Sequence, residues 1–216
     1  MRPEHAPFDD SILATPLDRE SALAVLVLAG AVRSPLVAER ALTFARDHGL
    51  GAGTALEMAL ESYLFAGFPR CISALAAYRR VYGPPAEGSA RRTIGAEDIA
   101  RWRKRGAALF RRIYAANTDR VLADLDAFHP ELADWILVDA YGKVLARPGA
   151  DARLRELAAV GALIVSGDSR QFTSHMRGAV HCGASAAETA AVIDLVERLA
   201  APESVAEARA AAARVL

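Results

Sequence analysis

The residues of this chain that can donate protons or act as nucleophiles near neutral pH are few, namely five histidines and two cysteines in 216 residues. Cys71 follows Pro69 by two positions, and a proline is well suited to be the first residue of a helix. Cys71 would then lie in the first helical turn beside Arg70, where the helix dipole and the cation lower the pKa of a thiol. The sequence therefore offers Cys71 as a reactive thiol, and the alternative is a small buried apolar side chain.

Patterns that bind metals or cofactors are missing from the sequence. It has no glycine-rich phosphate loop and no HExxH, and the adjacent pair His181-Cys182 lacks the spacing of a zinc site. We therefore expect an activity that needs no metal and no organic cofactor.

Charge and hydropathy exclude two further classes of partner. The 26 basic residues balance the 26 acidic ones, and apolar residues interrupt the only basic cluster, at 101–112, so we expect no nucleic-acid binding. The longest apolar run, 22–32, is too short for a bilayer, which needs about 20 residues. With no apolar segment at the N-terminus, the sequence predicts a cytoplasmic protein that binds no membrane.

The apolar segments have the composition of helices. They are rich in Ala and Leu, show no period-2 alternation, and are separated by Gly and Pro; they cover 22–32, 56–65, 107–114, 132–141, 154–165 and 186–199. The sequence therefore predicts an all-α fold. Because segments such as 22–32 have no polar face, we also expect a homo-oligomer, either a trimer or a hexamer.

Several short motifs occur twice in the chain, at offsets of 131–136 residues. The pairs are Arg19-Glu20 with Arg155-Glu156, His48-Gly49 with Cys182-Gly183, Thr54-x-x-Glu57 with Ser185-x-x-Glu188, and Gly67-Phe68-Pro69 with Ala200-Ala201-Pro202. This repetition predicts two related helical units, at 11–83 and 96–216, with a linker at 84–89 and two or three extra helices early in the second unit.

Thr54-x-x-Glu57 and Ser185-x-x-Glu188 each follow a glycine and precede an apolar run. This pattern is typical of a capping box after a glycine C-cap, and it predicts the same helix–turn–helix in both units. It also gives Glu188 a structural role that competes with any catalytic one.

A series of motifs in the second half points to a known family. They are Arg105-Gly106-x-x-Leu109-Phe110, Ala140-Tyr141-Gly142, Arg147-Pro148-Gly149, Leu154-Arg155-Glu156-Leu157 and Ser174-His175-x-Arg177-Gly178-Ala179-x-x-Cys182-Gly183. In order and spacing this half resembles the carboxymuconolactone decarboxylase family, which has the alkylhydroperoxidase D-like fold. The resemblance implies two fused copies of that helical unit and an active site in an oligomer. The chain departs from the family at Leu145-Ala146, where an aromatic residue is usual, and at Cys182, where asparagine is.

The resemblance implies a lyase that removes CO₂ from a small carboxylated lactone or a product of aromatic degradation. Such a reaction needs cations for the carboxylates, a donor for the developing oxyanion and one general acid. The resemblance gives His175 the role of general acid and makes Glu188 a further candidate catalytic residue. Arg155 and Arg177 are the expected substrate-binding cations, and the alternative for Arg155 is a structural salt bridge to a neighbouring helix. Tyr63 of the first unit is expected to share one composite pocket with His175.

Two other functions stay open. Alkylhydroperoxidase D-like relatives carry Cys-x-x-Cys-x-x-x-His, and the run from Cys71 keeps the first cysteine but has Ala74 and Tyr78 at the other positions. A peroxide-reducing or redox-responsive protein would use Cys71 and would need a second thiol, for which only Cys182 is available. The third alternative is a non-catalytic helical scaffold that binds a small molecule.

Overall fold

The computed structural model describes residues 8–84 and 92–216, and within these ranges every regular element is a helix, which confirms the predicted all-α fold. The elements are η2 (Asp10–Leu13), α1 (Arg19–Arg33), α2 (Pro35–Asp47), α3 (Ala52–Tyr82), α4 (Ala96–Tyr114), η3 (Ala115–Asn117), α5 (Thr118–Phe128), α6 (Leu132–Trp135), the π-helical η4 (Ile136–Leu145), α7 (Ala152–Ser166), α8 (Ser169–His181), α9 (Ala186–Val196), η5 (Glu197–Leu199) and α10 (Pro202–Val215).

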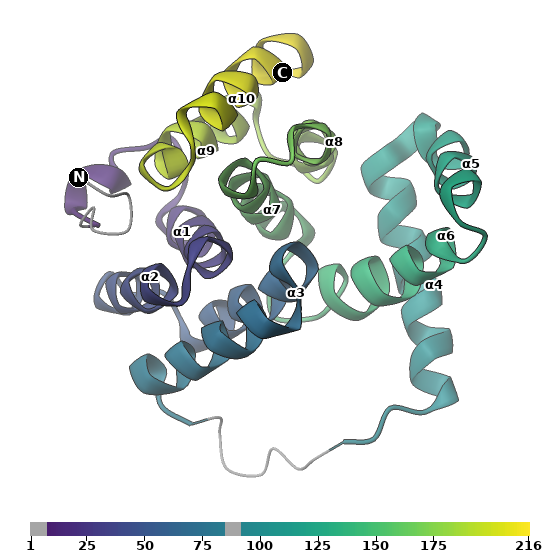
Figure 1. Ribbon diagram of the computed structural model, residues 1–216, viewed down its shortest axis with the longest axis horizontal. Helices are drawn as coiled ribbons and strands as arrows, with labels where there is room; N and C mark the ends of the chain where they lie inside the picture. Colours follow the sequence, from purple (N-terminus) through teal and green to yellow (C-terminus); the bar gives the residue numbers. More distant parts are fainter. Residues whose placement is uncertain (1–7, 85–91) are drawn as a thin grey trace.

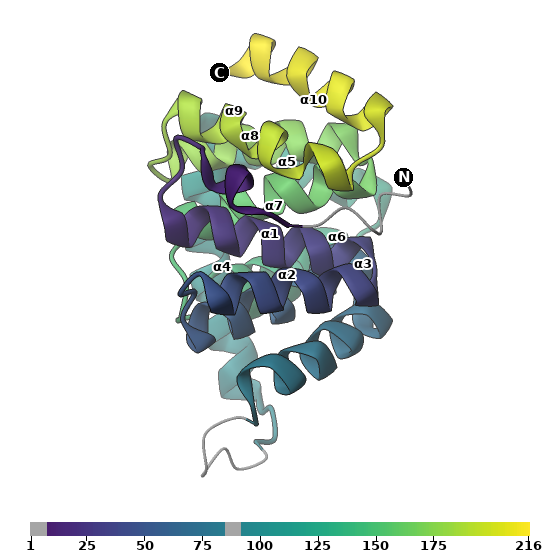
Figure 2. The same ribbon diagram turned by 90° about the vertical axis from the view of Figure 1, so that its left-hand side faces the viewer.

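Two apolar helices, α1 and α7, form the centre of the molecule. Every residue from 21 to 32 in α1 and from 154 to 165 in α7 is buried, because a helix without a polar face must be covered on all sides. The two helices pack against each other, with α2 and α3 on one side and α8, α9 and α10 on the other (Figures 1 and 2). Both halves of the chain thus contribute to one hydrophobic core.

The halves share one local geometry. Helices α1 and α2 have 15 and 13 residues, as α7 and α8 do. Gly49 and Gly183 both have positive φ, and the next residue in each turn donates its N–H to a carbonyl five positions back. The predicted common turn is confirmed, whereas the origin of the two halves as copies stays a prediction.

The two Arg-Glu pairs of the proposed repeat are not in equivalent places. Asp18 caps α1, so Arg19 is its first residue; Asp151 caps α7, so Arg155 is its fourth. The pairs are one helical turn out of register. Their similarity in sequence therefore does not mean that the two pairs have the same structural role.

Only one of the two predicted capping boxes forms. Ser185 and Glu188 cap α9 as predicted. The prediction for Thr54 and Glu57 is wrong, since α3 begins earlier, after Gly51, and the Thr54 hydroxyl donates to Glu20 instead (2.8 Å). The carboxylate of Glu57 is drawn into the core by two arginines, which are stronger partners than a backbone N–H.

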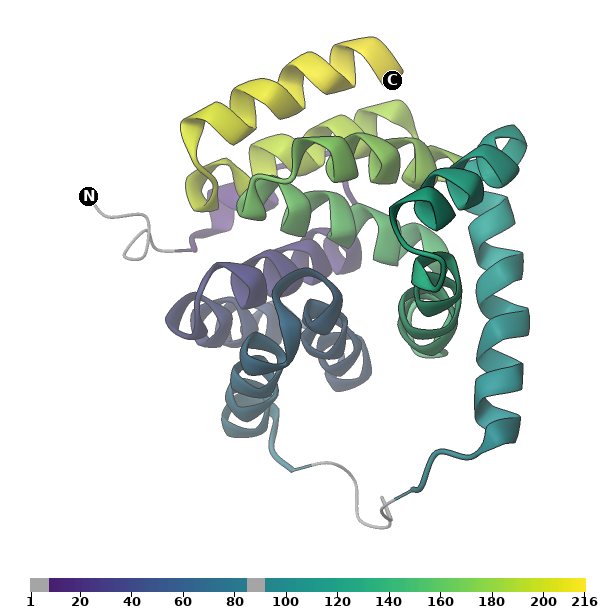
Figure 3. The ribbon, with the colours of Figure 1, turned by 45° about the vertical axis from the view of Figure 1, so that its right-hand side comes forward.

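The helices α4, α5 and α6 with η4 lie beside the central stack (Figure 3). They pack in a second, smaller apolar cluster around Phe110 and Tyr141, to which Cys182 also belongs. The predicted linker, 84–89, falls outside the described residues except for Pro84. Within the described part of the chain, no helix is long and apolar enough to cross a membrane.

The crossing of α4 and η4 depends on two glycines, Gly106 and Gly142. A Cβ on Gly106 would lie 2.0 Å from the carbonyl oxygen of Leu137 and 2.7 Å from the Gly142 nitrogen, and a Cβ on Gly142 would lie 2.2 Å from the Trp102 carbonyl oxygen. Backbone meets backbone here, so no side chain can move aside. This contact gives the two glycines of the family-like motifs a purely steric reason.

Replacing Gly106 by alanine is therefore expected to lower the free energy of unfolding by about 3 kcal/mol, the upper end of the usual loss from overpacking. Urea denaturation followed by circular dichroism measures the change. Gly53→Ala is the matched control: Gly53 is also helical, a Cβ there meets nothing within 4 Å, and alanine should be neutral or stabilising. Equal stability of Gly106→Ala and the native protein would contradict the packing described.

Candidate functional site

A cavity of about 900 Å³ lies where α3, α4, α5, η4, α7 and α8 meet. Much of its wall is apolar and comes from distant parts of the sequence, including Phe65 of α3, Phe110 of α4, Leu125 of α5 and Leu145 of η4. His175 of α8 lines the same cavity. A large apolar pocket with a few polar groups is the usual form of a small-molecule site.

His175 is bound from behind by a buried carboxylate. Its Nδ1 lies 2.8 Å from Oε2 of Glu156, which comes from the neighbouring helix α7 and is 1% exposed. Gly178, three residues after His175, makes this possible, because a Cβ there would lie only 2.3 Å from the same oxygen. Since Glu156 occupies Nδ1, Nε2 is the ring nitrogen left to act on a molecule in the cavity.

The surroundings of His175 favour its protonated form. Burial alone would lower the pKa of this imidazole, but the charge of Glu156, its hydrogen bond and the charge of Glu61 together outweigh burial and raise the pKa above 6.5. The edge of the Phe65 ring faces the imidazole, with centroids 6.1 Å apart. His175 is thus a proton donor held in one orientation at an apolar wall.

Arg155 is placed differently from the predicted substrate-binding cation. It is 1% exposed and donates to Glu61 (2.6 Å), to Glu57 (2.8 Å) and to the carbonyl of Arg147 (3.1 Å). It does not line the cavity. With all three of its guanidinium nitrogens engaged inside the protein, Arg155 joins α7 to α3 and lies away from any substrate in the cavity.

Glu61 is the unusual member of this buried cluster. It is fully buried, and its Oε1 has no hydrogen-bond partner in the described part of the protein. Burial raises the pKa of Glu61 to about 7, against the opposing effect of Arg155. The cluster therefore holds a carboxyl group that changes its protonation near neutral pH.

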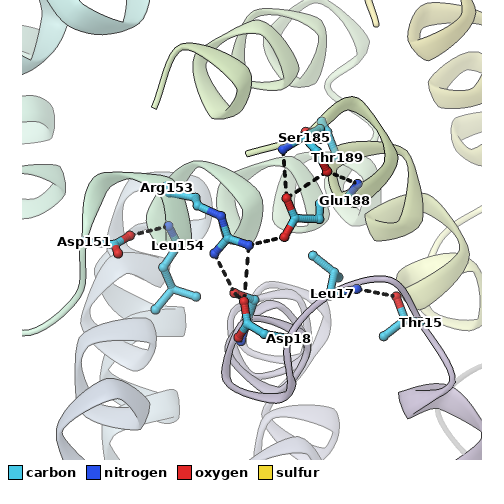
Figure 4. A network of polar contacts seen from close by, with 10 residues as sticks. Thr15, Leu17, Asp18, Asp151, Arg153, Leu154, Ser185, Glu188 and Thr189 are labelled. Carbon is cyan, nitrogen blue, oxygen red and sulfur yellow. Dashed lines mark hydrogen bonds and ion pairs between the residues drawn. The ribbon is translucent and has the colours of Figure 1, made fainter. Parts of the chain in front are cut away.

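Glu188 belongs to the capping box and to a second ion-pair network. Its carboxylate accepts from the backbone and hydroxyl of Ser185 (both 2.8 Å) and pairs with Arg153, which also reaches Asp18 on α1 (Figure 4). The backbone hydrogen bond from Ser185 is the main reason that the pKa of Glu188 is lowered. Glu188 is not among the residues that line the cavity, so its position supports the structural role.

The predicted lowering of the pKa of Cys71 is wrong. Gly67 breaks α3 with φ 71°, so Pro69 does stand near the start of a helical segment, but Cys71 is only 5% exposed. Burial raises the pKa of this thiol and outweighs the opposing hydrogen bonds of Ser62 and Tyr63. Cys182 is equally buried, and its pKa is raised to about 11. Neither thiol has the environment of a reactive cysteine.

The other two predicted binding residues also lie outside the cavity lining. Arg177 is exposed on α8. Tyr63 packs on Phe68, with ring centroids 4.5 Å apart, and lies under the ammonium group of Lys143. The first half does contribute to the pocket, through Leu64 and Phe65, the neighbours of Tyr63 in sequence.

Sequence reasoning missed Glu156, the partner of His175, and the two arginines that line the cavity. Glu156 had a signal, since a charged residue inside the apolar run 154–165 needs a buried partner. Nothing in the sequence pattern singles out Arg120 and Arg170, yet both line the cavity. Neither guanidinium group has a hydrogen bond or ion pair within the described ranges. They replace Arg155 and Arg177 as the available cations.

The spacing Cys-x-x-Cys-x-x-x-His can also be counted back from His175. It then places Asp168 and Gln171 at the two cysteine positions, and both residues line the cavity. Beside the histidine, this chain thus has a carboxylate and an amide instead of two thiols.

The comparisons with known proteins concern the part of the chain that contains this histidine. Residues 130–214 match the sequence model of the "Carboxymuconolactone decarboxylase family". A relative, "Peroxisomal protein 2" of Schizosaccharomyces pombe, is 31% identical over 131 residues, which cover 60% of this chain and 60% of the fungal protein. The chain thus matches rather less than two thirds of that relative. The segment from α6 to α10, with Glu156 and His175, therefore carries the sequence pattern of the carboxymuconolactone decarboxylase family.

Proposed function

We propose that this protein is a cofactor-free decarboxylase, or a related proton-transfer enzyme, that acts on a carboxylated lactone or a similar product of aromatic degradation, with His175 as general acid. The observation that supports this most directly is the Glu156–His175 pair at the wall of an apolar cavity, within the segment that matches the family. The pair supplies an oriented proton donor, which this chemistry needs.

In the proposed reaction the bond between the substrate carbon and its carboxylate breaks, and CO₂ leaves. The electron pair moves into a conjugated carbonyl to give an enolate. Nε2 of His175 then transfers its proton to a carbon of the enolate, and His175 regains a proton from solvent. Glu156 stabilises the imidazolium before the transfer and keeps the ring in place after it.

Tyr114 is our candidate for stabilising the enolate oxygen. It lines the cavity and accepts a hydrogen bond from Tyr141 (3.2 Å), so its own hydroxyl hydrogen can point into the cavity. Burial raises the pKa of Tyr114 and raises that of Tyr141 well above 10, so both phenols keep their protons. A neutral donor in an apolar pocket suits a developing oxyanion.

The assembly and the compartment remain proposals. Exposed apolar side chains outside the cavity, among them Phe68, Ile72 and Trp135, are consistent with burial in a trimer or hexamer. The name of the fungal relative refers to the peroxisome, whereas we predict a cytoplasmic protein from the sequence.

The rival thiol chemistry gives a direct test. With a γ-carboxylated unsaturated lactone as substrate, we expect the protein to release CO₂. Neither the substitution Cys71→Ser nor a thiol-blocking reagent should change this rate by more than about twofold, because the buried thiol takes no part in the proposed reaction. Reduction of an organic hydroperoxide is measured in parallel. Hydroperoxide turnover that Cys71→Ser abolishes, without decarboxylation by the native protein, would contradict the proposal and support the redox function.

A further inference from the structure

The wall that α5 gives to the cavity is apolar and poorly covered by protein. Thr118 is the only buried residue of this helix. Val121, Leu125 and Phe128 lie along the cavity, and Phe128 is 75% exposed. Val121 and Leu125 are only partly buried where they pack beside Phe110, so this face leaves hydrophobic area for a ligand to cover.

The charges of the same cavity balance one another. Apart from His175, which is paired with Glu156, two cations line it, Arg120 and Arg170, and so do two carboxylates, Asp124 and Asp168. Asp168 is held by the Ser166 hydroxyl (2.7 Å), while the two guanidinium groups have no partner in the part of the chain that the structure describes. A ligand with several carboxylates would meet both acids. A single carboxylate can use the free donors of the arginines without an excess of negative charge.

His175 gives an independent sign that a ligand belongs here. It is 9% exposed and lines the cavity, and Glu156 binds its Nδ1 from behind. Its Nε2 has no hydrogen-bond partner within the described residues. Nε2 therefore faces the cavity with its hydrogen-bonding capacity free for a bound molecule. The volume of about 900 Å³ also lies near the upper end of pockets for small molecules, about 300–1,000 Å³.

From these observations we infer that the cavity binds an amphipathic monocarboxylic acid with a long or bulky apolar group. The apolar group covers the face of α5 formed by Val121, Leu125 and Phe128, and the carboxylate binds Arg120 and Arg170. This inference deepens the proposed function and rests on it for the role of His175 as the general acid that acts on the bound molecule. The binding itself does not require turnover.

Saturated monocarboxylates from hexanoate to dodecanoate are suitable probes, and decan-1-ol is the uncharged counterpart of decanoate. Isothermal titration calorimetry on the full chain measures the Kd of each. We expect affinity to rise about three- to fourfold per methylene, as burial of CH₂ groups predicts, and to be at least about tenfold lower for the alcohol. Affinity that does not depend on chain length would overturn the inference.

Two pairs of variants test where the ligand lies. Arg120→Gln with Arg170→Gln should weaken decanoate binding about tenfold or more, while Arg177→Gln, an exposed arginine of α8 outside the cavity lining, should not. Phe128→Ala should flatten the dependence on chain length, while Phe68→Ala, also exposed at 62%, should not. Loss of binding in the control variants, or none in the cavity variants, would contradict the inference.

The same series separates this inference from the proposed function. His175→Gln should keep the dependence on chain length, since the ring is not needed for the apolar contact. Chain-length-dependent binding without any decarboxylation would refute the enzyme and leave the ligand class standing. Decarboxylation of a short lactone without any binding of longer acids would support the enzyme and refute the ligand class.

Discussion

Replacing His175 by glutamine is expected to lower the rate of decarboxylation by about 10²–10⁴-fold, the usual contribution of a general acid, without unfolding the protein. Glutamine can still donate a hydrogen bond to Glu156 across the 2.8 Å contact, so the buried carboxylate keeps a partner. Its amide has no proton to transfer to carbon. Steady-state kinetics measures the loss, and thermal unfolding shows whether the fold is retained.

The pH dependence gives a second readout of the same role. The acid form of His175 is the active one, so the rate should be constant at low pH and fall as the pH rises through the raised pKa of His175. Glu156→Gln removes the charge that raises this pKa and should move the fall to lower pH. Glu188→Gln is the control, because Glu188 caps α9 and should leave the profile unchanged. An unaltered rate in His175→Gln would refute the assignment.

Replacing Arg155 by methionine is expected to lower the free energy of unfolding by about 3–5 kcal/mol at pH 8, the usual result of removing one partner from a buried ion pair. Arg155 is 1% exposed, and its loss leaves the buried carboxylate of Glu61 without the ion pair that it has within the described residues; Glu57 still has Arg147. Urea denaturation measures the change. Arg153→Met is the matched control, because the more exposed ion pairs of Arg153 contribute about 0–1 kcal/mol.

This loss should depend on pH in a defined direction. The pKa of Glu61 is about 7 in the folded protein and lies near 4.5 when the side chain is free, so the folded state keeps the proton of Glu61 within that window. Without Arg155 the ionised form becomes still less favourable, and the loss should be smaller at pH 5 than at pH 8. A loss of the same size at both values would show that Glu61 does not titrate as described.

The features that the sequence determined are those that depend on neighbours within one or two helical turns. The apolar runs 22–32 of α1 and 157–165 of α7 had to be buried helices, whatever their partners. The Ser185-x-x-Glu188 cap and the turns at Gly49 and Gly183 follow from hydrogen bonds that span five residues or fewer. These interactions form wherever the helix ends, so the chain fixes them locally.

The tertiary structure alone decided which charged groups meet. Thr54-x-x-Glu57 has the same local pattern as its counterpart, yet Glu57 binds Arg155, 98 positions away, and Glu61 binds the same arginine over 94 positions. The helix start at Cys71 favours a reactive thiol, but burial against distant residues reverses the effect on its pKa. Arg120 and Arg170 gain their place at the cavity only because α5 and α8 lie on two sides of it. Desolvation and long-range ion pairs set these outcomes, and neither is encoded within one helix, because both depend on which segments cover which.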